Sequence, residues 1–511
     1  MNKLAIVLIL LYITGQCVAS NEFGASKYNK FKRYHEHTLE KFNQHCVNNP
    51  LESTTVIHAI QGRTNISPLL GQAVTVEAVV VGDFQDTTTG LSGFFIQEEA
   101  YDIDDDILTS EGLFVFDNDF GVDVSLGDVV RVSGVVNEKF GLTEINAVSN
   151  IEICASGYTY IRATPVKLPF ASETELEQYE GMLIRLHQKL TVTENFNLGR
   201  FGEVVVSSHG RLFTPTNVVN PGDAANALQA KNNLNRLIID DGNSQQNPDP
   251  IVYPSTGLSA FNTLRSGDTV KHVTGIVGFT ARNYRIHPVI KPYFVVRNPR
   301  SFTPFLSGEN TIRVASFNVL NYFNGNGQGA GFPTSRGADS KTEFDRQRDK
   351  IITAISAINA DVIGLMEMEN DGYGISSAIQ NLVNGLNAVA PLGVQYAFIH
   401  PGVSQIGTDA ITVGFIYRKE TLRPLGKAAI LDSSIDTRFN DQKNRPTLAQ
   451  TFVEVATDAK LTIAVNHLKS KGSNCDDLGD PNTGDGQGNC NLTRRDAAKA
   501  LVDWLAGDPT D

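Results

Sequence analysis

The spacing of apolar residues changes character along the chain. Between Val56 and about residue 155, apolar and polar residues alternate with a period of two, which is typical of short strands. The predicted strands, separated by turn residues, are Val74–Val81, Gly93–Gln97, Gly112–Phe116, Val129–Val136 and Leu142–Ile145. Five short strands of this kind suit a small barrel of the OB type. We therefore predict an OB-like β domain over residues 56–160.

A second β-rich stretch runs from Thr164 to Arg300. Its predicted strands are Met182–Leu190, Val204–Ser207, Leu237–Ile239, His272–Gly278 and Tyr293–Val296, and residues 217–235 read as an insertion. We predict a second OB-like β domain over residues 161–300, followed by a linker over residues 301–310. This domain contains a basic group, Arg282, Arg285, His287 and Lys291, which either contacts a substrate or balances local acidic residues.

The pattern becomes strand, polar loop, helix and strand after Thr311. The first strand, Ile312–Val319, is mainly apolar and delivers Asn318 near its end. A Gly-rich loop and a helix with one apolar face then lead to a second strand, residues 361–368. A unit of this length usually forms two parallel neighbouring strands with a right-handed crossover. Asn318 and Glu367 should then emerge together at the carboxyl-terminal edge of the sheet, where ligands of α/β proteins bind.

The amino-terminal segment has the features of an export signal. Lys3 precedes a short apolar run, and small residues follow at positions 18–20, so we predict a signal peptide over residues 1–20. The alternative is a membrane anchor, but the apolar run is short for a bilayer span. The prediction implies a secreted protein, with the periplasm as an alternative location. Residues 21–55 read as a basic helical arm that packs rather than binds DNA.

Composition limits how the chain could bind nucleic acid. The 511 residues carry a formal net charge of −13, which is the wrong sign for gripping DNA by bulk electrostatics. Any DNA binding must therefore be local, through a few Arg and Lys residues and a divalent cation.

Four cysteines remain once the leader is removed. Cys46, Cys154, Cys475 and Cys490 form an even count, which in an exported chain indicates disulfides. We predict the pairs Cys475–Cys490 and Cys46–Cys154. Zinc binding is the alternative, but the sequence holds no Cys-x-x-Cys pair to support it.

Three short motifs carry a resemblance to a known family. Residues 316–318, 364–367 and 463–468 resemble, in order and spacing, signatures of the endonuclease/exonuclease/phosphatase family, which includes DNase I and the abasic-site endonucleases. Residues 366–372, 466–471 and the upstream run 238–250 are similar to secreted bacterial nucleases of the ExeM type. The resemblance covers most of the chain after the leader, more loosely before about residue 150.

The resemblance implies a fold and a set of site residues. Residues 311–511 would form a DNase I-like catalytic domain, an α+β four-layer α/β sandwich. Asn318, Glu367 and His467 would be catalytic, and Glu367 and Asn318 would bind the metal, which is Mg²⁺ or alternatively Ca²⁺ or Mn²⁺. Hydrolysis of a phosphodiester needs such a cation on the phosphoryl oxygens and stabilisation of the developing charge. Taken singly, each residue also fits a structural role.

Five weaker candidates surround this group. Arg445, Lys469 and Lys471 are candidates for contacting DNA phosphates. Glu369 lies on the same strand face as Glu367 if the period of two continues, and Asp409 leads into a predicted strand.

The family has two further motifs, Gly-Asp-x-Asn and a terminal Ser/Thr-Asp-His, which this sequence does not contain. We therefore expect a catalytic domain truncated before its C-terminal motifs and inactive as a fragment. Three hypotheses follow: an extracellular metal-dependent nuclease acting on DNA, a phosphatase or phosphodiesterase acting on a small or lipid phosphate, and a non-catalytic secreted OB-domain binding protein. For the nuclease we expect a monomer without stable membrane association.

Overall fold

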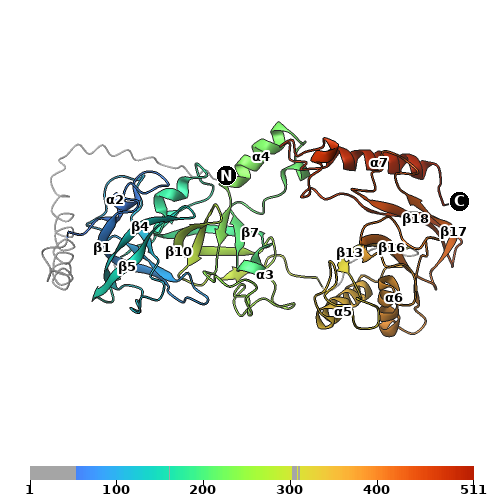
Figure 1. The fold of residues 1–511 in the computed structure, drawn as a ribbon, viewed down its shortest axis with the longest axis horizontal. Coiled ribbons are helices and arrows are strands. Elements are labelled where there is room, and N and C mark those ends of the chain that lie inside the picture. Colours follow the sequence, from blue (N-terminus) through green and yellow to red (C-terminus); the bar gives the residue numbers. More distant parts are fainter. Residues whose placement is uncertain (1–52, 160, 302–307, 309–310, 511) are drawn as a thin grey trace, which may run out of the picture. The chain divides into compact units, whose positions relative to one another are not determined.

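The computed structural model describes residues 53–159, 161–301, 308 and 311–510. Strands outnumber helices in this part of the chain (Figure 1). The predicted signal peptide and nearly all of the predicted arm over 21–55 lie outside the described residues. Contacts divide the chain into two compact units, one made of residues up to 212 together with 230–299, the other of residues 213–229 and 300–511.

The first five strands form a closed barrel in the order β1-β2-β3-β5-β4. After α2 (Ile57–Gln61) come β1 (Ala73–Phe84), β2 (Gly93–Gln97), β3 (Gly112–Val115), β4 (Val129–Lys139) and β5 (Leu142–Ala155). Strand β1 pairs antiparallel with both β2 and β4, while β3 and β5 are parallel. Alternate side chains of β1, including Val74, Val76 and Val80, fill the interior. The five strands predicted from the period of two are therefore present.

The next strands repeat this topology. They are β6 (Thr164–Val166), β7 (Leu183–Glu194), β8 (Val204–Ser207), β9 (Leu237–Ile239), β10 (Thr269–Thr280), β11 (Asn283–Pro288) and β12 (Phe294–Val295), with α3 (Leu198–Phe201) and α4 (Asp223–Leu234) between them. A pairing of β10 with β7 closes β7-β8-β9-β11-β10 into a ring, and β9 is parallel to β11. Strand for strand, this is the order of the first barrel.

Strand β11 contains two members of the basic group, and their burial explains why the sequence did not predict it. Arg285 and His287 are 3% and 4% exposed. One terminal nitrogen of Arg285 lies 2.6 Å from Glu203 and 2.6 Å from Asp240, and Nδ1 of His287 lies 3.7 Å from Asp240. Arg285 and His287 therefore balance buried acidic side chains, which is the second of the two interpretations given for the basic group.

The two barrels pack against each other within one unit. Val81, Phe95 and Phe114 of the first barrel meet Ile276 of the second in one apolar cluster. Gly112 allows the closest approach, because a Cβ atom there would lie 2.2 Å from the backbone of residue 181. The Gln97 side chain accepts a hydrogen bond from the Leu183 amide at 2.8 Å, so polar groups join the barrels too.

The acidic segment after β2 begins with two buried carboxyl groups. Glu98 and Glu99 are 1% and 4% exposed. Burial raises the pKa of Glu98 to about 8 and that of Glu99 to about 7. Glu98 accepts a hydrogen bond from the Ile57 amide, at the start of α2, at 2.6 Å.

These raised values predict a pH dependence of stability. Above a pH of about 4.5 the unfolded chain loses protons that the folded barrel still holds on Glu98 and Glu99, so stabilisation present at acidic pH is lost as the pH rises toward 8. We expect hydrogen exchange of the β2 amides to give a lower free energy of unfolding at pH 8 than at pH 5, after correction for the intrinsic exchange rates. Glu98→Gln should reduce that difference, and an unchanged pH dependence in this variant would contradict the assignment.

The C-terminal unit has two sheets between helices. Its elements are β13 (Val314–Tyr322), α5 (Lys341–Ile358), β14 (Val362–Glu369), α6 (Ala378–Val389), β15 (Tyr396–Phe398), β16 (Ile411–Arg418), β17 (Leu422–Leu431), β18 (Arg445–Glu454), β19 (Lys460–His467) and α7 (Asn491–Ala506). The sheets have the orders β13-β14-β16-β15 and β17-β18-β19. Apolar residues of α5 and α6 cover the first sheet, the two sheets share a core, and α7 packs beyond the second (Figure 1).

Residues 213–229 associate with the C-terminal unit, although we assigned them to the second β-rich domain. The Gly222 amide donates to the Asp485 carbonyl at 2.8 Å, and Gly486 lies against Thr216 and Ala225. The segment is therefore held by the loop that joins the two C-terminal cysteines.

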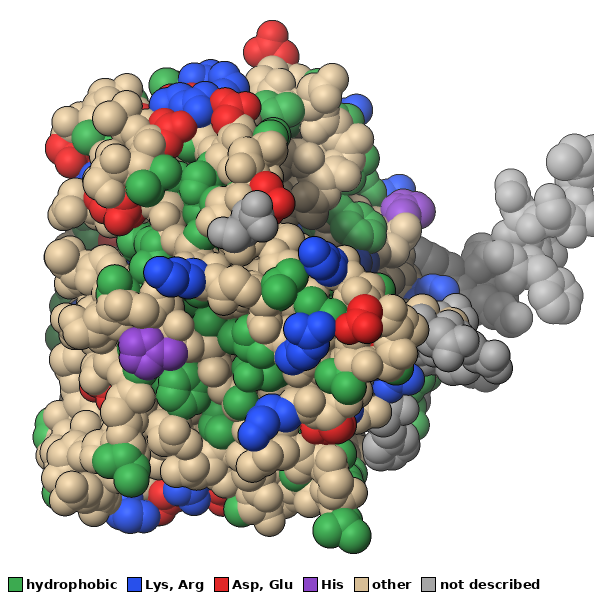
Figure 2. Space-filling model, turned by 90° about the vertical axis from the view of Figure 1, so that its right-hand side faces the viewer, with side chains coloured by type: hydrophobic (Ala, Val, Ile, Leu, Met, Phe, Trp, Pro, Cys, Tyr) green, Lys and Arg blue, Asp and Glu red, His purple; other side chains and the backbone are tan. Residues whose placement is uncertain are grey.

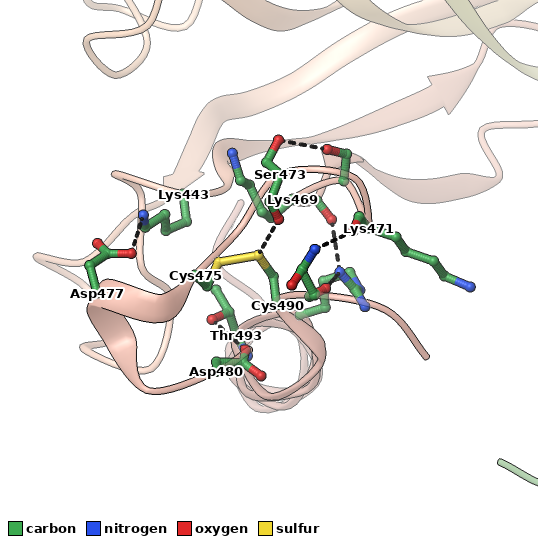
Figure 3. Close-up of a disulfide and its surroundings, with 12 residues drawn as sticks. Lys443, Lys469, Lys471, Ser473, Cys475, Asp477, Asp480, Cys490 and Thr493 are labelled. Carbon is green, nitrogen blue, oxygen red and sulfur yellow. Dashed lines mark hydrogen bonds and ion pairs between the residues drawn. A yellow bond between two sulfur atoms is a disulfide. The ribbon is translucent and has the colours of Figure 1, made fainter. Parts of the chain in front are cut away.

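That loop is closed by the predicted Cys475–Cys490 disulfide, which is present and buried (Figure 3). Asp480, inside the loop, accepts the Thr493 amide at 2.8 Å near the start of α7. Cys46 lies outside the described residues, so its predicted bond to Cys154 stays a prediction.

Removing this disulfide should destabilise the C-terminal unit. Replacing both Cys475 and Cys490 with Ser opens a loop of 15 residues, which costs up to about 3 kcal/mol in the chain-entropy model. We expect a lower urea midpoint for this unit under oxidising conditions and no difference from wild type under reducing conditions. Equal midpoints in both conditions would contradict the prediction.

Candidate functional site

The predicted parallel strand pair places the first two site residues together. Strands β13 and β14 are parallel, with Asn318 opposite Met366. Helix α5 lies between them in sequence, with Ser340 as its N-cap and Asn359 as its C-cap. The Asn318 side-chain amide donates a hydrogen bond to Oε1 of Glu367 at 2.7 Å. The expectation that these two residues emerge at one sheet edge is confirmed.

Glu367 sits on a β-bulge. Its φ is 65°, and the register of β14 against β16 slips between Met366 and Met368. A positive φ is uncommon for a residue other than glycine, and bulges often redirect a side chain beside a functional site. Met368, rather than Glu367, joins Ile363 in the core beneath α5 and α6. The bulge therefore turns Glu367 out of the covered face.

The bulge also corrects the prediction for Glu369. A period of two would place Glu369 on the face of Glu367, but the extra residue in β14 breaks that period. Oε2 of Glu369 instead accepts the Asn324 amide at 3.0 Å, and burial raises its pKa to about 7.

His467 reaches the same place from the second sheet. It ends β19, and its Nε2 lies 3.7 Å from Oε1 of Glu367. Burial lowers the pKa of His467 and the neighbouring Arg445 lowers it further, while Glu367 acts in the opposite direction. Its Nδ1 atom is buried without a hydrogen-bond partner among the described residues. A largely neutral imidazole beside a carboxylate can donate to a phosphoryl oxygen or bind a cation.

Two arginines share one carboxylate next to this group. Asp409 lies 2.9 Å from Arg445 and 2.7 Å from Arg336, using a different oxygen for each. Arg445 on β18 lies opposite His467 on the neighbouring strand β19. Sequence alone did not point to Arg336, because it lies in the Gly-rich loop outside any motif.

Asn370, which follows β14, holds the loop that carries Asp409. Its side chain donates to the carbonyls of Ile406 and Asp409 at 3.0 Å each and accepts the Ile406 amide at 3.2 Å. It is 7% exposed, so these bonds do not compete with bulk water. Asn370 lies in the motif 366–372 that is similar to ExeM-type nucleases, but the sequence alone did not indicate that it holds this loop.

Asn370→Ala should loosen this loop and destabilise the unit. The buried Ile406 carbonyl and the part-buried Asp409 carbonyl would lose a donor, which costs about 1–3 kcal/mol. We expect faster hydrogen exchange at residues 405–411 and a lower urea midpoint. Asn384→Ala is the control, because Asn384 lies exposed on α6. Unchanged exchange in the Asn370 variant would contradict the role.

Lys469 and Lys471 follow His467 but do not join the group. Within the described part of the chain, no hydrogen bond or ion pair connects either ammonium to Glu367, His467 or Asp409. Their backbone carbonyls bind Arg494 and Asn489 at 3.3 and 3.2 Å, beside the disulfide (Figure 3). The face of the molecule in Figure 2 intersperses basic, acidic and apolar side chains, without a large area of one sign.

The donor set suits a cation that needs few protein ligands. Groups of three or more His, Cys, Asp or Glu side chains occur among the described residues in the first barrel, but none includes Glu367. Each carboxylate oxygen of Glu367 accepts one hydrogen bond, from Asn318 and from the Asn321 amide, and keeps a free lone pair. Mg²⁺ commonly binds through one or two carboxylates and keeps its waters. The residues present therefore fit a magnesium ion.

Comparisons with known proteins cover only parts of this chain. Residues 175–297 match a family model described as a domain of unknown function, DUF8508. No curated protein matches the sequence. Among solved structures, the chain is similar to the human Nocturnin catalytic domain with bound sulfate anion, at 18% identity and a TM-score of 0.23. That similarity covers 38% of this chain and 58% of the other, and we infer neither fold nor function from it at this TM-score. The resemblance to ExeM-type nucleases therefore stays a prediction.

Proposed function

We propose that this protein is a metal-dependent phosphodiester hydrolase that acts on DNA. The observation that carries the proposal is the meeting of Asn318, Glu367 and His467. These residues lie on strands of two different sheets, yet Oε1 of Glu367 lies 2.7 Å from Asn318 and 3.7 Å from His467. Separate elements bring a carboxylate, an amide and an imidazole to one point, where together they can bind a cation and donate to a phosphoryl oxygen.

Each side chain has a part in this proposal. Glu367 and Asn318 hold Mg²⁺, or alternatively Ca²⁺ or Mn²⁺, which when bound would neutralise charge on the phosphoryl oxygens. His467 donates to a phosphoryl oxygen. Arg445, held by Asp409 at 2.9 Å, faces the phosphate, and Asp409 keeps its guanidinium in place. Lys469 and Lys471 contact DNA phosphates farther along the strand.

The remaining assignments are part of the same proposal. We assign the protein to the secreted class, supported by the predicted signal peptide and by a buried disulfide. None of the helices in the described residues has the length and apolar character to cross a bilayer. Both barrels are assigned to the OB type, supported by their shared strand order. DNA is the expected partner and a monomer the expected state.

Digestion of supercoiled plasmid by the protein expressed from its complete gene tests the function. We expect nicking in Mg²⁺, loss of nicking in EDTA and recovery when Mg²⁺ is restored in excess. Para-nitrophenyl phosphate, a small phosphomonoester, should be a poor substrate. Cleavage that persists in EDTA, or preference for the small ester over DNA, would overturn the proposal.

A further inference from the structure

A cleft of about 890 Å³ lies between the two barrels of the first unit. It is lined on one side by the end of β4 and the start of β5, and on the other by β10, β11 and the segment around α3. A cleft of this size is large enough for a small organic ligand. None of the residues of the candidate site described above lines it.

Phenylalanine rings provide much of the apolar wall. The rings are Phe95, Phe114, Phe116 and Phe140 from the first barrel, and Phe201 and Phe279 from the second. Phe140, at the turn between β4 and β5, is 76% exposed. The turn lies directly against the second barrel, because a Cβ atom on Gly141 would be 2.7 Å from the Phe279 ring. A ligand in the cleft would cover this exposed ring.

The charges in the cleft favour a positive ligand. The basic side chains Arg285 and Arg236 are already paired with lining carboxylates, at 2.6 and 3.4 Å. Glu144 is only 4% exposed, accepts the Asn137 amide at 2.8 Å and has no ion pair among the described residues. Lys139 attracts Glu144 without pairing with it, and its ammonium lies 5.1 Å from the Phe140 ring centre. Both arginines are therefore occupied and an anion would find only the exposed Lys139, whereas a cation would find the buried Glu144 carboxylate and the other phenylalanine rings that line the cleft.

We propose that this cleft binds an amphipathic organic cation, a protonated amine attached to a flat apolar body. The apolar body lies among the phenylalanine rings, where stacking and cation–π attraction both act. The ammonium group lies toward Glu144, which supplies the opposite charge. This site is independent of the proposed hydrolase function.

A matched series of ligands tests the proposal on the full chain. Phenylethylamine, phenylethanol and phenylacetate have similar shapes but are positive, neutral and negative at pH 7. Titration calorimetry should show that the amine binds at least about 10-fold more tightly than the alcohol, with the carboxylate weakest. Equal affinity for amine and alcohol, tighter binding of phenylacetate, or no binding of the amine at millimolar concentration would overturn the proposal.

Substitutions locate the site and separate charge from shape. Glu144→Gln keeps an acceptor for Asn137 but removes the charge, so it should weaken the amine about 10-fold and leave the alcohol unchanged. Phe140→Ala should weaken both ligands, and it changes an exposed side chain that the fold does not need. Phe261→Ala is the control, because Phe261 is 94% exposed and lies outside the cleft. Amine binding that is unaffected by Phe140→Ala would place the ligand elsewhere and refute the site.

Discussion

Replacing Glu367 with Gln should lower Mg²⁺-dependent cleavage of DNA by at least about 10²-fold, the scale of losing a dominant electrostatic contribution. Gln keeps the shape of the side chain and can still accept the Asn318 amide, which lies 2.7 Å away. It removes the negative charge that would bind the cation. The measurement is the initial rate of plasmid nicking at saturating Mg²⁺ for the protein from the complete gene.

A matched control and a second readout make this test specific. Glu420→Gln removes a charge from an exposed turn of the same unit and should leave the rate unchanged. Binding of Mn²⁺, followed through paramagnetic broadening of His467 resonances, should be lost in the Glu367 variant and kept in the control. Near-normal cleavage by Glu367→Gln would show that this carboxylate does not hold the metal.

Replacing Arg285 with Met should destabilise the second barrel by about 3–5 kcal/mol, because removing one member of a buried ion group leaves charge unpaired. Glu203 and Asp240 each lie 2.6 Å from the guanidinium, and Arg285 also donates to the Thr280 carbonyl at 2.9 Å. Met occupies similar space but offers no donor. Urea denaturation measures the lost free energy of unfolding, and hydrogen exchange of the β9 and β11 amides locates the loss in the second barrel.

The control for this prediction is Arg236→Met in the same unit. Arg236 is 39% exposed and lies 3.4 Å from Glu194, so solvent already screens the pair. Its loss should cost less than about 1 kcal/mol. A triple replacement, Arg285→Met with Glu203→Gln and Asp240→Asn, should recover part of the stability, since no unpaired charge remains. Equal costs for Arg285→Met and Arg236→Met would refute the role assigned to burial.

The sequence by itself determined the elements whose side chains follow a simple period. The strands of the first barrel alternate because one face of each fills the interior, as Val74, Val76 and Val80 do. The pattern of strand, helix and strand after Thr311 indicated a parallel pair, because a helical connection returns the chain in the same direction. That pairing brings Asn318 and the end of β14, which contains Glu367, to the same edge of the sheet.

Only the tertiary structure decided which polar groups are buried and how distant loops meet. The sequence pattern did not predict strand β11, because the polar residues Arg285 and His287 occupy core positions. Their burial is tolerable only where Asp240 lies beside them. The bulge at Glu367 depends on register against β16, and the joining of Arg336 to Asp409 brings together residues 73 positions apart. Such contacts leave no local pattern, because their energies arise from partners that the chain brings together only when it folds.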